Sequence, residues 1–206
     1  TANGVSALGN IGPGVTLENV EDNRVGYSVA NLGNVIAYNQ GAGIRFPGTT
    51  NLTGNQFVGN SMFANQFGID LGSAGVTYND SGDYDDGANG LLNFPVLLGA
   101  ESTGDSVSVA VSYSSSPNKT YALDFYWSST CNASGYGEGE LYLGWDSLAT
   151  DAGGAALKQV GLAADNLQPG FITATAIDSA GSTSEFSACI PLEGASYTLM
   201  LPLVVK

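Results

Sequence analysis

The stretches Asn34-Val35-Ile36-Ala37-Tyr38-Asn39 and Asn60-Ser61-Met62-Phe63-Ala64-Asn65 decide the fold, because they are two copies of one pattern placed 26 residues apart. Each copy is followed by a glycine and a short apolar run, Gly43-Ile44-Arg45-Phe46 and Gly68-Ile69-Asp70-Leu71. Short strands separated by Asn and Gly at this repeat length are typical of a chain that coils into stacked parallel sheets. Because one coil cannot bury its apolar face alone, the repeats predict a stack.

Two further segments belong to the same series. Gly14-Val15-Thr16-Leu17 matches the glycine-led run, and Asn55-Gln56-Phe57-Val58-Gly59-Asn60 resembles another strand. Asparagine tolerates left-handed backbone and can bond to an asparagine in the next coil, so we expect it at the turns. The prediction for residues 1–75 is a short right-handed parallel β-helix. Its expected interior residues are Ile36, Ile44, Phe57, Met62, Phe63 and Ile69.

A second pattern begins after an acidic connecting loop at residues 76–93. Val107, Val109 and Val111 alternate with polar residues, which is the period of a half-buried strand. About seven such strands in roughly 100 residues predict an immunoglobulin-like β-sandwich over residues 94–193. The expected strands, after an opening run at 94–98, are 106–113, 121–128, 141–148, 155–162, 171–177 and one near 186–190. The fold class is therefore all-β.

The C-terminal tail, residues 194–206, is the most apolar stretch of the chain. Its alternation predicts a strand with one apolar face, and Pro202 would confine that strand to a sheet edge. Three interpretations stay open: pairing with another subunit, folding back on its own domain, or a sorting signal. The predicted assembly residues on this face are Tyr197, Leu199, Leu201, Leu203 and Val205.

Composition excludes several classes of function. The chain has 5 Lys and Arg against 19 Asp and Glu, a net charge of −14, so nucleic acids and anionic lipid heads would repel it. It has no histidine, which excludes Ser-His and Cys-His catalysis. No segment has the roughly 18 consecutive apolar residues that a membrane span needs.

Two cysteines, Cys131 and Cys189, lie far apart and match no metal-binding spacing. We expect them to form one disulfide inside the second domain, which would suit an oxidising, extracellular compartment. The alternative is a pair of buried free thiols.

The acidic loop is the strongest candidate for a binding site. Asp80, Asp83, Asp85 and Asp86 fall within seven residues, and neighbouring glycines allow sharp turns. Crowded carboxylates on a turn-rich loop are hard oxygen ligands that suit calcium, although the spacing is not that of an EF-hand. The alternative is a solvated acidic linker.

Several of these stretches resemble the C-terminal part of bacterial right-handed parallel β-helix repeat proteins. These are large exported proteins, and the ending is similar to tails found in filamentous bacteria of the chloroflexus type. The resemblance implies the same architecture and a location outside the cell or on its surface, with little information on activity. It rests on residues 34–39, 68–72, 79–96, 131–144, 184–189 and 201–205.

These observations lead to a functional expectation. Residues 2–10 resemble the middle of a repeat, so the first coil would expose an open edge that templates strand addition. We expect a non-catalytic structural protein that associates with itself head to tail into a filament or surface layer. The alternatives are a carbohydrate-binding or adhesive module recognising cell-surface polysaccharide, and a polysaccharide lyase. The aromatic residues that could form a stacking face for sugars, or equally pack in the sandwich core, are Tyr121, Tyr126, Trp127, Tyr136, Tyr142 and Trp145.

Overall fold

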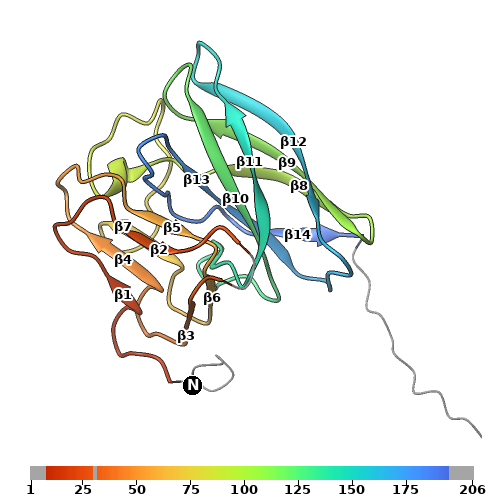
Figure 1. Ribbon diagram of the computed structural model, residues 1–206, viewed down its shortest axis with the longest axis horizontal. Helices are drawn as coiled ribbons and strands as arrows, with labels where there is room; N and C mark the ends of the chain where they lie inside the picture. Colours follow the sequence, from red (N-terminus) through yellow and green to blue (C-terminus); the bar gives the residue numbers. More distant parts are fainter. Residues whose placement is uncertain (1–7, 30–31, 195–206) are drawn as a thin grey trace, which may run out of the picture.

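The computed structural model describes residues 8–29 and 32–194, and it confirms the prediction of an all-β chain. Small parallel sheets lie on one side of the molecule, and a large curved sheet lies on the other (Figure 1). The helical content of the described residues is a single 3-10 turn, η1 (Asn89–Leu91). None of these residues belongs to a helix long and apolar enough to cross a membrane.

The N-terminal region forms three small parallel sheets. Repeated positions face each other in register: Ile44 lies opposite Ile69, and Ile36 lies opposite Met62. The chain therefore passes through the same three sheets on successive turns. The first sheet contains β1 (Val15–Thr16), β4 (Ile44–Pro47) and β7 (Ile69–Gly72), the second β2 (Arg24–Gly26) and β5 (Gln56–Val58), and the third β3 (Val35–Ala37) and β6 (Ser61–Phe63).

Apolar side chains of the three sheets meet in one core. Ile44, Phe46 and Phe57 are buried there, and so are the other expected interior residues except Phe63. Phe63 is half-buried and packs edge-on against Tyr38, with ring centroids 5.5 Å apart. Its strand alternates Ser61-Met62-Phe63, so Met62 points inward and Phe63 points away.

Asparagines connect successive turns at the corners between sheets. The Asn65 Oδ1 accepts hydrogen bonds from both the backbone N–H and the side-chain amide of Asn39, at 3.1 and 2.8 Å. Asn60 accepts the same two bonds from Asn34, and Asn55 accepts them from Asn23. These rows satisfy buried backbone groups that lie outside the strands.

The C-terminal region is one seven-stranded sheet that nearly closes on itself like a barrel. Val107, Val109 and Val111 point into its core, as their alternation predicts. In spatial order the strands are β11 (Leu141–Ala149), β10 (Thr120–Ser128), β13 (Phe171–Ile177), β14 (Ile190–Glu193), β8 (Val96–Ser102), β9 (Ser106–Ser114) and β12 (Ala155–Ala163).

The last strand lies later in the chain than predicted. Residues 186–190 were expected to form it, but β14 starts at Ile190. Phe186 is instead buried in the core of the N-terminal region, with its ring 5.3 Å from that of Tyr126. The segment before β14 therefore fills the junction between the two regions. The predicted assembly residues of the tail, Tyr197, Leu199, Leu201, Leu203 and Val205, lie outside the described residues.

Candidate functional site

The acidic loop brings together three of its four predicted ligands. Carboxylate oxygens of Asp80, Asp83 and Asp85 lie within 4.8 Å of one another. Asp86 does not join them, because it is exposed and its Oδ1 accepts a hydrogen bond of 3.0 Å from Asn51. The predicted set of four is therefore a group of three, with Asp86 beside it.

Asn93 holds the loop in this shape, a role that the sequence analysis missed. Its Oδ1 accepts a bond from the backbone N–H of Asp80, and its own N–H donates to Asp83 Oδ1, both at 3.0 Å. Its side-chain amide also donates to the Asp80 carbonyl. Asp83 has a positive φ of 58°, which lets the chain turn back toward Asn93.

Two carboxylate oxygens of the group have no hydrogen-bond partner among the described residues. Asp83 is held by Asn93 and by the hydroxyl of Ser115, which bonds in turn to Tyr121. The Oδ1 atoms of Asp80 and Asp85 are buried and accept no hydrogen bond from the described residues. A buried charge without a partner is costly, so these two oxygens are the part of the loop most in need of a ligand.

The electrostatics of the loop favour a cation. Burial raises the pKa of Asp83, and the neighbouring charges of Asp80 and Asp178 raise it further. Burial also raises the pKa of Asp85, as do Asp80 and Asp83. The adjoining hollow, of about 380 Å³, is lined mainly by polar residues, and Lys119 is one of them. Oxygen ligands of this kind fit a hard divalent ion such as calcium.

A second group of carboxylates lies at the junction of the two regions. Glu138 is buried, and its Oε2 accepts the backbone N–H and the side-chain amide of Asn65, each at 2.9 Å. Its Oε1 accepts a bond from Asn132. Glu138 thus takes the position of the next asparagine in the row that runs from Asn39 to Asn65.

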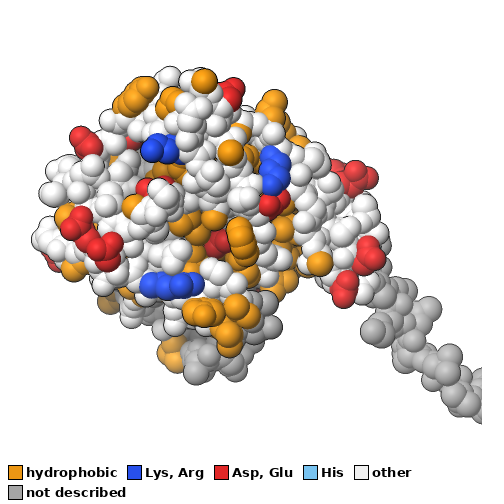
Figure 2. Space-filling model, turned by 45° about the horizontal axis from the view of Figure 1, so that its top comes forward, with side chains coloured by type: hydrophobic (Ala, Val, Ile, Leu, Met, Phe, Trp, Pro, Cys, Tyr) orange, Lys and Arg blue, Asp and Glu red, His pale blue; other side chains and the backbone are white. Residues whose placement is uncertain are grey.

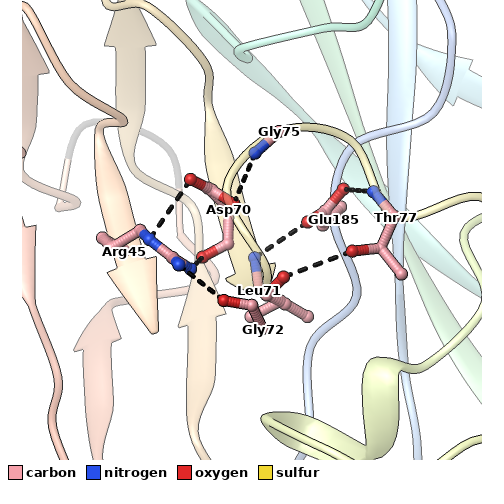
Figure 3. A network of polar contacts seen from close by, with 7 residues as sticks. All are labelled: Arg45, Asp70, Leu71, Gly72, Gly75, Thr77 and Glu185. Atoms are coloured by element: carbon pink, nitrogen blue, oxygen red, sulfur yellow. Dashed lines mark hydrogen bonds and ion pairs between the residues drawn. The ribbon is translucent and has the colours of Figure 1, made fainter. Parts of the chain in front are cut away.

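Glu185 binds the last turn of the stack in the same manner (Figure 3). Its two oxygens accept the backbone N–H groups of Leu71, at 2.8 Å, and Thr77, at 2.9 Å. Beside it, Arg45 pairs with Asp70 at 3.3 Å. Burial is the main cause that raises the pKa of Glu185 to about 7 and that of Asp70 to about 6.

Hydroxyl groups of the C-terminal region satisfy other backbone groups of the second turn. Thr183 Oγ1 accepts the N–H of Phe57, and the Tyr126 hydroxyl accepts that of Gly59, both at 2.9 Å. Tyr126 also donates toward buried Asp124, which accepts a second bond from Tyr142. Burial raises the pKa of Asp124 to about 6.

The opposite end of the stack is formed by β1, β2 and β3. Each of these strands pairs with another strand on one side only among the described residues. They border a hollow of about 430 Å³. None of its described lining residues carries a charge: they are Leu8, Asn10, Gly14, Val15, Val25, Asn34, Val35, Ile36, Ala37, Tyr38 and Asn39.

The cysteines and aromatic residues that the sequence singled out do not form one site. Cys131 and Cys189 are joined as a disulfide with a Cα–Cα distance of 6.0 Å. The aromatic residues considered as a stacking face do not share one environment: Tyr121 and Tyr126 are buried, whereas Trp145 is 59% exposed. The face seen in Figure 2 shows hydrophobic side chains in several places, with acidic and basic side chains scattered between them.

Comparison with known proteins assigns no family to the chain: no family model matches it, and no curated protein is significantly similar to it.

Proposed function

We propose that this chain is a non-catalytic extracellular structural protein, in which an immunoglobulin-like unit closes one end of a short right-handed parallel β-helix. The observation that carries the proposal is the contrast between the two ends of the stack. At one end, Glu138, Glu185 and Thr183 satisfy backbone groups of the coils. At the other end, β1, β2 and β3 are edge strands among the described residues.

An exposed sheet edge is a template for further strands, so this second end is the proposed site of self-association. The parallel pairing of β3 with β6 supports this, because it shows that the chain already extends its sheets by stacking. Repeated association of subunits through such an edge would build a filament or a surface layer. The disulfide is compatible with a location outside the cell.

The buried carboxylates support a structural role over a catalytic one. A general acid needs a free proton-transfer path to a substrate. Both oxygens of Glu185 accept backbone hydrogen bonds, and Asp70 is buried against Arg45. A carbohydrate-binding module is the second candidate, but the scattered aromatic residues favour it less.

We also propose that Asp80, Asp83 and Asp85 bind calcium and thereby stiffen the connection between the two regions. The support is a group of three carboxylates in which two buried oxygens accept no hydrogen bond from the part of the chain that the structure describes. Calorimetric titration of the metal-free chain with calcium tests this. Heat of binding together with a higher melting temperature is expected, and neither effect would be seen if the loop is only a solvated linker.

Sedimentation of the full chain, combined with a glycan array, tests the structural proposal. Concentration-dependent association without glycan binding is the expected result. A monomer that binds a defined glycan would replace the proposal with the carbohydrate-binding function.

A further inference from the structure

One loop of the C-terminal region covers strand β6 at the capped end of the stack. This cap loop, residues 129–140, connects β10 to β11. Its Gly139 carbonyl accepts the backbone N–H of Met62, and its Glu138 carboxylate accepts that of Asn65, both at 2.9 Å. The cap loop therefore covers the side of β6 that does not pair with β3.

The contact between the cap loop and the stack is polar and incompletely filled. A hollow of about 340 Å³ is lined by both, with Met62 and Phe63 on β6 and Asn132, Glu138 and Glu140 on the loop. Burial is the main cause that raises the pKa of Glu138, so its ionised carboxylate would gain hydration if the loop opened. The closed loop thus needs a restraint that opposes this gain.

A second capping segment, which carries Thr183 and Glu185, is held to the large sheet by its own bonds. The N–H groups of Ser184 and Ser187 donate to carbonyls of β13, at 2.9 and 2.8 Å. The hydroxyls of the same two serines accept N–H groups of that strand. This segment therefore has an attachment to β13 that does not involve the cap loop.

The disulfide between Cys131 and Cys189 joins the cap loop to the chain that follows this second segment. Both cysteines are half-buried, which leaves the bond open to a small dithiol. Two backbone hydrogen bonds join the same two parts of the chain. Gly137 donates its N–H to the Ser187 carbonyl at 2.9 Å, and Cys189 donates its N–H to the Gly135 carbonyl at 3.0 Å.

From these contacts we infer that the disulfide is a redox-sensitive latch, which keeps the cap loop closed on β6 and releases it on reduction while the rest of the fold stays intact. A dithiol would supply the electrons. Its thiolate attacks one sulfur of the disulfide and displaces the other as a thiolate, and its second thiol then closes the oxidised reductant into a ring. The protein gains two electrons and two protons and ends with two thiols.

Opening of the latch would leave β6 with one unpaired side, which is a sheet edge that a further strand can join. The second capping segment would stay in place on β13. Reduction would therefore change the capped end of the stack only over β6. This inference goes beyond the proposed self-association and does not depend on it.

Hydrogen exchange of the full-length chain, followed at single amides by NMR, tests the latch with the disulfide intact and in excess dithiothreitol. We expect the N–H groups of Met62 and Asn65 to exchange at least about tenfold faster after reduction. The N–H groups of Phe57 and Leu71, which donate to the second capping segment, are the control within the same molecule. Their exchange should change by less than about twofold.

The double variant Cys131→Ser, Cys189→Ser is the matched control for the reductant. It should exchange like the reduced chain and show no further change in dithiothreitol. Equal acceleration at all four amides, including complete unfolding on reduction, would overturn the inference, because the bond would then stabilise the whole fold. Unchanged exchange at Met62 and Asn65 in the reduced chain would overturn it as well, and so would acceleration by the reductant in the double variant.

Discussion

Glu138 accepts two hydrogen bonds from Asn65, at 2.9 Å each. Asn65 accepts the same two bonds from Asn39 one turn earlier. The last member of an asparagine row is therefore a glutamate from the other region of the chain. This substitution explains how a repetitive stack ends without leaving its final amide groups unsatisfied. Glu138 thereby links the two regions directly, as Thr183, Tyr126 and Glu185 also do.

Glu138→Ala removes the acceptor of the Asn65 backbone N–H in a buried place. We expect the free energy of unfolding to fall by about 2 kcal/mol, the cost of a buried donor without a partner. Glu138→Gln keeps one acceptor oxygen and should lose less. Urea denaturation measures both variants, with Glu101→Ala, at an exposed position of β8, as the control. Equal stability of Glu138→Ala and the control would show that the contact contributes nothing.

Acidification from pH 8 to pH 5 should stabilise the protein. The pKa values of Glu185, Asp70 and Asp124 are raised by burial to about 7, 6 and 6 from 4.5, 3.8 and 3.8. In this range the folded state takes up protons that the unfolded chain does not bind, so the free energy of unfolding rises as the pH falls. The gain is complete below the unfolded pKa values and is lost above about pH 7.

Thermal unfolding in chelator at pH 5 and pH 8 measures this effect. Asp124→Asn mimics the protonated group, and it should reduce the difference in melting temperature between the two pH values. Asp165→Asn is the matched control, since Asp165 is exposed. If Asp124→Asn and the control keep the same pH dependence as the native chain, the buried carboxylate is not its source.

Asp85→Asn should weaken calcium binding by about tenfold or more, because it removes one of three clustered charges. Its Oδ1 accepts no hydrogen bond within the described residues, so the substitution should cost little in folding. Asp86→Asn should bind calcium about as well as the native chain, since Asp86 bonds to Asn51 instead. Calorimetry of the two variants decides between the group of three and the group of four predicted from sequence.

Reduction of the Cys131–Cys189 disulfide should lower the free energy of unfolding by about 2–4 kcal/mol, because it closes a loop of 58 residues in the unfolded chain. Urea denaturation with and without reductant measures the loss. The double variant Cys131→Ser, Cys189→Ser should match the reduced protein. No change on reduction would mean that the unfolded chain is not constrained by this bond.

Most strands of the two regions were predictable because their signals are local, although β2 (Arg24–Gly26) was not predicted. Repeat spacing placed Ile36 opposite Met62 and Ile44 opposite Ile69, and alternation placed β9 to β13 within about a residue at each end. The position of β14 was not predictable in this manner. The hydroxyls of Ser184 and Ser187 accept backbone N–H groups of β13 and donate to the carbonyl of the next residue in the chain. This segment therefore lies beside β13 but is held there partly by side chains and is not itself a strand.

The candidate site was predictable only in part for a similar reason. Clustering of aspartates in the sequence identified the loop, but the turn at Asp83 and the bonds to Asn93 decide which carboxylates meet. Glu138 gave no local signal, since it lies between two glycines and its partner Asn65 is 73 residues away. Contacts that distant are set by the packing of the two regions.

Hydrogen exchange of the full chain tests most directly whether the C-terminal region caps the stack. The N–H groups of Phe57, Gly59 and Leu71 donate to side chains of that region. If the two regions form one cooperative body, these amides should exchange as slowly as those of β10 and β13 and should be released together with them as denaturant is added. Much faster exchange at these three amides, with β10 and β13 still protected, would contradict the account.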